Sequence, residues 1–593
     1  MANISYLEDK LMREISLDNM WALITRFSTL VRESGSQDER TAMEYIIEKL
    51  KEYGIPYNVY EPDLYLSIPK SATVEVLEPE KKVLRHDNRV MNPKVPSMSP
   101  SADITAELVY VPSVMPKSAV DMFDAGVGKI ESDISGKIVL TEGLSIMPKK
   151  AAALMKAGCI GIITINPGPR THEGIMTTIW GTPTLENIKD KPSVPGVNIC
   201  KEDGEYLKNL LNRSRVKVRI KTVLEEGWKK CLIPVADVKS PENPTEFLLL
   251  HGHLDSWHVG IGDNATGNAV LLELARVLHN NRNALKRSVK VAWWPGHSTG
   301  RYAGSTWFAD HFALELDEHC IAQVNCDSPG CVGATSYEDL MCMSEVEDFM
   351  RKVVKDVTGL EAYCTRPVRA GDYSFNHIGI TSFLMLSSTI PEAVRKEKGL
   401  YAVGGCGGNV WWHTEEDDMR IADKENLLRD AKLYLISVLR VINADIYPFD
   451  FRAFVNSSLE IFKKYQEASE NLFDFKPLID DALNLKASLE NLYKKTQSVK
   501  GKREQEIINQ TLMKIARILI PVNYTDKERF DHDPAVPIPA YPDIYPATQL
   551  PSYKNQTNEF RFLINQLTRG ANKVRWAFRE AKRVVDSTIQ SIG

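Results

Sequence analysis

The chain has 593 residues and a net charge of −5, with 43% hydrophobic and 25% charged residues. A single hydrophobic core stops growing near about 250–300 residues, so this length predicts about three or four domains. The balanced charge excludes a dedicated nucleic-acid-binding protein, which would carry a strongly basic face. The ordinary composition excludes collagen-like, low-complexity and globally disordered chains.

No export signal, membrane span or disulfide framework is visible in the sequence. The opening residues, MANISYLEDKLMREISLDN, contain no apolar run, and nowhere do about 18 apolar residues follow one another. The nine cysteines are an odd number and form no CxxC pair. We therefore expect a soluble, cytoplasmic protein with neither a membrane nor a nucleic-acid partner.

The first half of the chain predicts helices followed by a separate α/β module. Apolar residues recur at helical spacing from about Leu17 to Tyr53, and Gly54 ends the second run. Residues 87–104 are rich in Pro and Ser and are typical of a linker. Beyond them, short β runs alternate with a helix, so we expect residues 101–229 to form a compact domain.

The middle of the chain predicts a three-layer, mostly parallel α/β domain made of residues 1–100 and 230–450. Residues 246–251 are a nearly continuous apolar strand, as in a sheet covered on both faces. A polar loop, HGHLDSWHVGIGDNATG, comes next, and strands, loops and helices alternate beyond it. Ligands of such sheets lie outside the carboxyl ends of the strands, where these polar loops begin.

The last part predicts a helical domain over residues 451–593. Asp423 caps a long amphipathic helix that closes the α/β domain. Residues 452–520 are mostly helical in pattern, a Pro-rich excursion follows, and a terminal helix begins at about Asn558.

Five polar residues lie where the predicted strands end. They are His253, Asp255, Asp263, Asp327 and His413. One such histidine or aspartate is most often a loop residue bonded to the backbone. Together they place imidazoles and carboxylates at one sheet edge, which is the mixture that a metal site needs.

With these motifs, the sequence resembles the zinc exopeptidase family that includes glutamate carboxypeptidase, the transferrin receptor and many bacterial aminopeptidases. The residues that carry the resemblance are His253-Leu254-Asp255-Ser256-Trp257, Asp263-Asn264-Ala265-Thr266-Gly267, Trp294 to Ser305, Asp327 and His413. The resemblance covers nearly the whole chain. It implies that the module within residues 101–229 is an inserted protease-associated domain and that the C-terminal helices form a homodimer.

The resemblance also implies roles for the five polar residues. His253, Asp263 and Asp327 would hold one Zn²⁺, and Asp263 would bridge to a second ion bound by His413. Asp255 would orient His253 and act as a catalytic residue from behind it. The residue types alone also admit another divalent metal.

One segment departs from the family pattern. The family has two adjacent glutamates after this strand, a general base and a ligand of the second ion, whereas this chain reads WPGHSTGRYAGS. Aligned at Trp294, the pair becomes His297-Ser298, and aligned at Gly304, it becomes Ser298-Thr299. His297 could replace the base or a ligand, or it could be a loop histidine bonded to the backbone.

Four further residues are candidates for the substrate side of the site. Asp372 falls where the family has a substrate-side aspartate, and Arg369 could bind a carboxylate with both of its terminal nitrogens. His258 and Tyr373 could line the pocket.

Three functions remain open from the sequence. The first is a metal-dependent hydrolase that cleaves a small peptide or another amide with metal-activated water. The second keeps the metal but runs divergent chemistry on a small C–N substrate, as a lyase or amidohydrolase would. The third is a non-catalytic, receptor-like binding protein.

Overall fold

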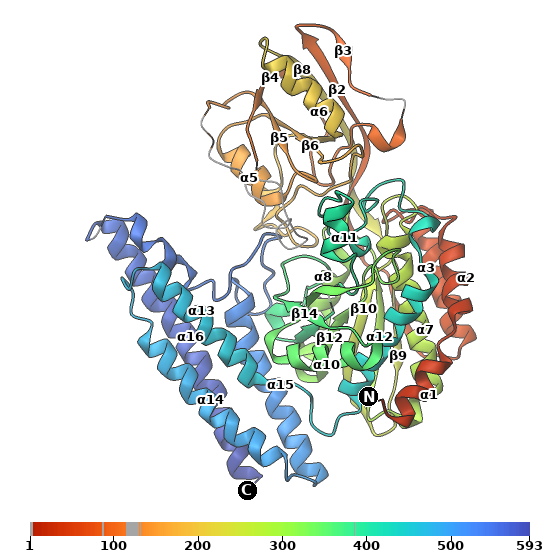
Figure 1. Ribbon diagram of the computed structural model, residues 1–593, viewed down its shortest axis with the longest axis vertical. Coiled ribbons are helices and arrows are strands. Elements are labelled where there is room, and N and C mark those ends of the chain that lie inside the picture. Colours follow the sequence, from red (N-terminus) through yellow and green to blue (C-terminus); the bar gives the residue numbers. More distant parts are fainter. Residues whose placement is uncertain are drawn as a thin grey trace.

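The computed structural model describes residues 4–85, 88–113, 130, 132–384, 386–554 and 556–592. Figure 1 shows an apical domain above a central α/β domain, with an arm of long C-terminal helices beside the latter. In the described part of the chain, no helix is both long enough and apolar enough to cross a membrane. All nine cysteines are free in the structure.

A six-stranded sheet forms the middle layer of the central domain, in the order β1-β9-β11-β10-β12-β15. The strands β11, β10, β12 and β15 are parallel, whereas β9 and β1 continue the sheet antiparallel at one edge. The prediction of a mostly parallel α/β sheet is confirmed. The strands are β1 (Tyr57–Tyr60), β9 (Ile233–Val238), β10 (Asn243–His253), β11 (Arg287–Trp294), β12 (Cys320–Asn325) and β15 (Thr381–Phe383).

Helices cover both faces of this sheet, which explains the unbroken apolar run in β10. Leu248 and Leu250 point into one core, and their neighbours Phe247 and Leu249 point into the other. On the first face lie α1 (Tyr6–Glu14), α2 (Leu17–Phe27), α3 (Gln37–Glu52), α7 (Thr266–Asn280), α10 (Glu347–Thr358) and α12 (Lys424–Ile442). On the second lie α8 (Ala303–His311) and α9 (Ala313–His319). A small parallel sheet of β13 (Tyr337–Met341) and β14 (Ala362–Thr365) and the short helix α11 (Glu392–Glu397) complete the domain.

The apical domain is built on a seven-stranded sheet in the order β3-β2-β8-β4-β5-β6-β7. Its strands are β2 (Asp63–Glu78), β3 (Lys82–Val83), β4 (Ala102–Tyr110), β5 (Ile138–Glu142), β6 (Gly161–Ile165), β7 (Gly196–Ile199) and β8 (Lys217–Lys230), and its helices are α5 (Pro148–Lys156) and α6 (Lys201–Leu211).

The structure starts this domain at Asp63 and not at residue 101. The long strand β2 pairs antiparallel with β8 along nearly its whole length, so it belongs to the apical sheet. Two adjacent crossings, 60–63 and 230–233, therefore join the apical and central domains.

The C-terminal part consists of α13 (Phe451–Ala468), α14 (Lys476–Thr496), α15 (Lys502–Tyr524) and α16 (Asn558–Ser591). Their apolar faces, among them Phe454, Leu485, Leu512 and Phe578, belong to one core that continues into the central domain. The helical prediction for this region is confirmed, and the Pro-rich excursion between α15 and α16 carries only a short 3₁₀ helix, Tyr545–Ser552.

Candidate metal centre

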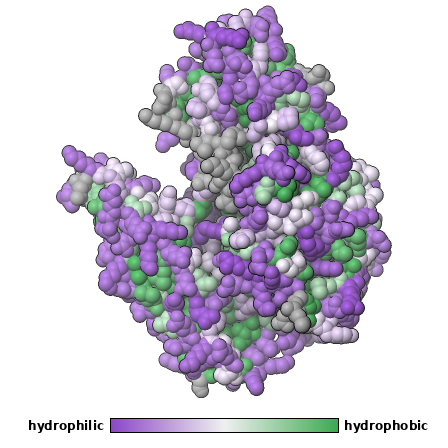
Figure 2. Space-filling view, viewed as in Figure 1, coloured by the Kyte–Doolittle hydropathy of each residue, from purple (hydrophilic) through white to green (hydrophobic). Residues whose placement is uncertain are grey.

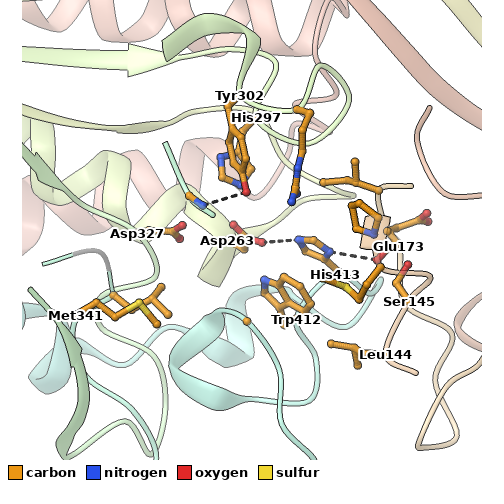
Figure 3. Close-up of a pocket in the computed structure, with 18 residues that line it drawn as sticks. Leu144, Ser145, Glu173, Asp263, His297, Tyr302, Asp327, Met341, Trp412 and His413 are labelled. Carbon is orange, nitrogen blue, oxygen red and sulfur yellow. Dashed lines mark hydrogen bonds and ion pairs between the residues drawn. The ribbon is translucent and has the colours of Figure 1, made fainter. Parts of the chain in front are cut away.

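The predicted ligands meet at the carboxyl edge of the parallel strands. His253 is the last residue of β10, His297 follows β11, and Asp327 follows β12. Asp263 lies in the turn Ile261–Ala265 before α7, and His413 lies in the loop before α12. Figure 3 shows Asp263 facing His413, with Asp327 and His297 beside them.

Three of these side chains fit a single ion. One ligand atom each from His253, His297 and Asp327 lies within 4.8 Å of the other two, and this is the one such trio among the described residues. His253 Nε2 lies 3.8 Å from Asp327 Oδ2 and 2.9 Å from Asp263 Oδ1. Ligand atoms around one tetrahedral zinc are about 3.3 Å apart, given bonds of about 2.0–2.1 Å. The separations therefore suit a bound metal ion.

Asp263 joins two histidines through its two oxygens. Its Oδ1 contacts His253, and its Oδ2 lies 3.1 Å from His413 Nε2. Burial raises the pKa of the Asp263 carboxyl, but His253 and His413 together hold it well below its usual value. The resemblance implied that Asp263 bridges two metal ions, and here its two oxygens face the two histidines that would hold those ions.

The charge around His253 also favours a cation. Burial lowers the pKa of His253, but Asp255, Asp263 and Asp327 more than offset this and raise it well above its usual value. Three carboxylates thus face His253, and a divalent ion at Nε2 would meet the same negative charge.

Each of the three rings is held from behind at Nδ1. His253 Nδ1 donates to the Asp255 carbonyl oxygen (2.9 Å) and His413 Nδ1 to the Glu173 carbonyl oxygen (3.2 Å). His297 Nδ1 donates to Asp372 Oδ2 (2.8 Å). A ring with its proton on Nδ1 offers the Nε2 lone pair, which is the form that binds a metal.

Asp255 acts on the loop after β11 more than on His253. Its carboxylate lies 3.7 Å from the His253 ring but accepts hydrogen bonds from Ser34 Oγ (2.9 Å), His297 N (3.1 Å) and Ser298 N (3.3 Å). The side chain therefore fixes the backbone that presents His297, while its carbonyl orients His253.

Asp417 positions the bridging aspartate and was not predicted. Its carboxylate accepts hydrogen bonds from the backbone nitrogens of Gly262 (2.6 Å) and Asp263 (3.0 Å). Burial, with the nearby Asp263 charge, raises the pKa of Asp417 to about 7. Nothing in the sequence distinguishes Asp417 as a positioning residue from the neighbouring acids of the run EEDD.

A second positioning residue is Arg32, which is fully buried. Its guanidinium donates to the carbonyl oxygens of Leu254 (3.0 Å), Val259 (2.7 Å) and Gly260 (2.8 Å). These bonds fasten the whole loop between His253 and Asp263 to the N-terminal helices.

We expect Arg32→Met to lower the free energy of unfolding by about 3–5 kcal/mol, because each buried carbonyl left without a donor costs about 1–3 kcal/mol. Chemical denaturation checks this, with Arg26→Met, an exposed arginine on α2, as the matched control. Equal denaturation midpoints for the two variants would contradict the role given to Arg32.

The metal ligands open into a cavity of about 70 Å³ between the domains. The central domain contributes Asp263, His297, Arg301, Tyr302, Asp327, Met341, Gly371, Leu386, Gly404, Trp412 and His413. The apical domain contributes Leu144, Ser145, Met147, Pro148, Glu173, Gly174 and Ile175. The backbones of Glu173 and His413 also bond to each other, since Glu173 N donates to the His413 carbonyl oxygen (2.9 Å).

None of the four predicted substrate residues lines this cavity. Asp372 is fully buried behind His297, and Tyr373 is fully buried against Met341. Arg369 donates to the backbone carbonyls of Tyr373 (3.0 Å) and Asp533 (2.8 Å). His258 lies 3.3 Å from Glu173 Oε1, outside the cavity lining. The sequence places all four near the site but does not reveal which way each side chain points.

Comparison with known proteins identifies two segments. Residues 235–436 match the model of Peptidase family M28, and residues 104–207 match that of the PA domain. Leucine aminopeptidase 2 of Trichophyton tonsurans is 25% identical over 314 residues, which are 51% of this chain and 57% of that protein. Carboxypeptidase Q of Xenopus laevis is 24% identical over 294 residues, 47% of this chain and 58% of that protein. The chain thus matches a little over half the length of these curated relatives.

Among solved structures, the fold resembles that of a zinc aminopeptidase from Bacillus subtilis. The TM-score is 0.51 at 19% identity, and the match covers 73% of this chain and 96% of the other. At this identity the likeness concerns the fold alone.

Proposed function

We propose that this chain is a metal-dependent hydrolase that cleaves an amide bond in a small peptide, because residues 235–436 match the model of Peptidase family M28 and residues 104–207 match that of the PA domain. The observation that carries the proposal is the meeting of His253, His297 and Asp327 beside a cavity that His297 and Asp327 line. A receptor-like protein has no use for three such side chains with their ligand atoms within 4.8 Å of one another.

We propose Zn²⁺ as the ion, held by His253, His297 and Asp327. Two imidazoles and one carboxylate are a donor set of catalytic zinc, which keeps its fourth position open for water. The relative from Bacillus subtilis is a zinc enzyme, in line with this choice. The second position of the family retains only His413 and one oxygen of Asp263 among the described residues, so a second ion binds weakly.

A bound zinc ion supplies Lewis acidity, which lowers the pKa of water and polarises the amide carbonyl. The chain's own residues must then move the proton. Because too few ligands lie nearby for a tight second ion, we assign to His413 the role of taking the proton of the attacking water and returning it to the leaving amine. Asp263 Oδ2, at 3.1 Å, stabilises the charged ring.

The test combines metal content with turnover. Protein purified without added metal should contain about one zinc per chain and hydrolyse dipeptides, and a chelator should remove both together. Tight metal binding without hydrolysis of any dipeptide or aminoacyl amide would reject the hydrolase and leave the divergent chemistry.

We also propose a homodimer that forms through the C-terminal helices. Large apolar side chains lie exposed there, namely Leu483 on α14 (48% exposed) and Phe562 and Trp576 on α16 (67% and 57%). Figure 2 shows hydrophobic residues gathered over this arm. We take these exposed apolar side chains as candidates for burial at an interface between two copies.

Sedimentation should give twice the chain mass at micromolar concentration, and Phe562→Glu with Trp576→Glu should give the monomer, because two buried carboxylates oppose association. Trp228→Glu, at an equally exposed tryptophan on β8, is the control that should leave the dimer intact. A monomeric parent protein would contradict the proposal.

We place the protein in the cytoplasm. The support is chemical: all nine thiols are free and eight of them are buried, as expected of a chain that folds under reducing conditions.

A further inference from the structure

Arg301 lines the cavity beside the metal ligands, and no anionic partner for it lies in the described part of the chain. Its side chain is buried, with the residue 6% exposed. Among the described residues, no carboxylate lies within ion-pair distance of its guanidinium, and its Nε has no hydrogen-bond partner. The contact that the guanidinium does make is with the Tyr302 ring, 4.7 Å from its centroid.

The backbone holds Arg301 in this place at a conformational cost. Arg301 and Tyr302 both have positive φ angles, of 47° and 70°. Side-chain-bearing residues persist in this region only when their surroundings enforce it, and such residues cluster at ligand sites. Here Tyr302 N donates to the His297 carbonyl oxygen (2.9 Å), and Gly181 N of the apical segment donates to the Arg301 carbonyl oxygen (2.6 Å).

One neighbouring side chain adds positive charge to that of Arg301. Arg369 is close enough to interact with Arg301, and both carry guanidinium groups. Burial first, and this repulsion to a lesser extent, lower the pKa of Arg369 to about 10. Arg369 donates its hydrogen bonds to backbone carbonyls. Its guanidinium carbon lies 3.5 Å from the centroid of the Trp180 ring.

A buried guanidinium without a counter-charge is costly unless a ligand supplies that charge. We propose that Arg301 binds a carboxylate of the substrate, and that the substrate is therefore a short peptide whose C-terminal carboxylate lies one residue beyond the bond to be cut. This inference rests on the proposed hydrolase and names its substrate class.

The lining of the cavity agrees with such a substrate. Its apolar wall, formed by Leu144, Met147, Ile175, Met341 and Leu386, suits one apolar side chain. The planar fork of an arginine matches a carboxylate with two parallel hydrogen bonds, which a neutral amide cannot accept equally well.

The first arm of the test compares alanyl-leucine with alanyl-leucinamide, which differ only in the carboxylate. Wild-type protein should prefer the free dipeptide, and Arg301→Met should lower its kcat/KM about 10²–10³-fold, the size of a lost buried charge pair. Arg301→Lys should regain about a tenth or more of the lost kcat/KM, because lysine restores the positive charge but not the two parallel hydrogen bonds of the guanidinium. The amide substrate should respond little to either change. Equal use of both substrates by the wild type would overturn the inference while leaving the hydrolase intact.

The second arm measures binding and needs no turnover. Calorimetry on the zinc-loaded protein should detect N-acetyl-leucine but not N-acetyl-leucinamide, and Arg301→Met should abolish the difference. Arg170→Met, at an arginine that pairs with Glu416 outside the cavity lining, is the control and should behave as the wild type. Arg301-dependent binding without hydrolysis would support the carboxylate site and reject the hydrolase. Inorganic phosphate that competes as well as the carboxylate ligand would show a general anion site and overturn the substrate class.

Discussion

His253→Ala and Asp327→Ala should each leave the protein without bound zinc. Each variant removes one of three ligands that meet within 4.8 Å, and catalytic zinc needs three protein ligands to stay bound. Asp327→Ala also removes a negative charge that offsets the ion's own charge. Metal analysis should fall from about one ion per chain to near zero, and hydrolysis should fall with it.

His311→Ala is the matched control, because this exposed histidine on α8 lies outside the site and bonds to the Trp307 carbonyl oxygen. Full zinc occupancy in either site variant, with the control unchanged, would mean that the ion is held elsewhere.

His297→Ala is the prediction that decides what replaced the missing glutamates. If His297 is a ligand, zinc content should drop well below one ion per chain, since only His253 and Asp327 remain of the trio. Unchanged zinc content with turnover lowered about 10²–10⁴-fold would contradict the ligand role and make His297 the base.

Asp372→Asn refines this experiment, because it leaves the ligands in place and weakens the bond that holds His297 from behind, along with the bond that Ser305 Oγ donates to Asp372 (2.7 Å). Loss of such an outer partner lowers metal affinity about 10–100-fold, so zinc should bind more weakly but still bind. The double variant His297→Glu with Ser298→Glu restores the family pair. A gain in aminopeptidase activity would place the divergence of this chain at these two positions.

The sequence predicted the features that depend on the regular spacing of apolar residues and on the polar residues at strand ends. The apolar run before His253 gave a buried parallel strand, and the polar residues after three strands met at one edge because parallel strands end together. His297 was reached through its place in the family motif, and the structure puts its ring on that of His253, with centroids 3.9 Å apart.

The sequence could not predict what depends on side-chain direction or distant pairing. Arg369 and Arg301 have the same chemistry, but one bonds to backbone carbonyls and the other lines the cavity. The residues next to Arg32 and Asp417 in the sequence show no distinctive motif. Their roles depend on hydrogen bonds to loops that lie far away along the chain. The start of the apical domain at Asp63 follows from strand pairing over more than 130 residues.

One small cluster behind the cavity wall joins all three parts of the molecule. Trp180 of the apical domain, Tyr302 of the central domain and Ala535 of the Pro-rich segment pack together, and Ala535 N donates to the Thr178 carbonyl oxygen (2.7 Å). The Asp533 carbonyl from the same segment holds Arg369. Neither the central domain alone nor a chain cut after α12 would therefore keep an intact cavity wall, so attempts to isolate a smaller working unit must retain the Pro-rich segment.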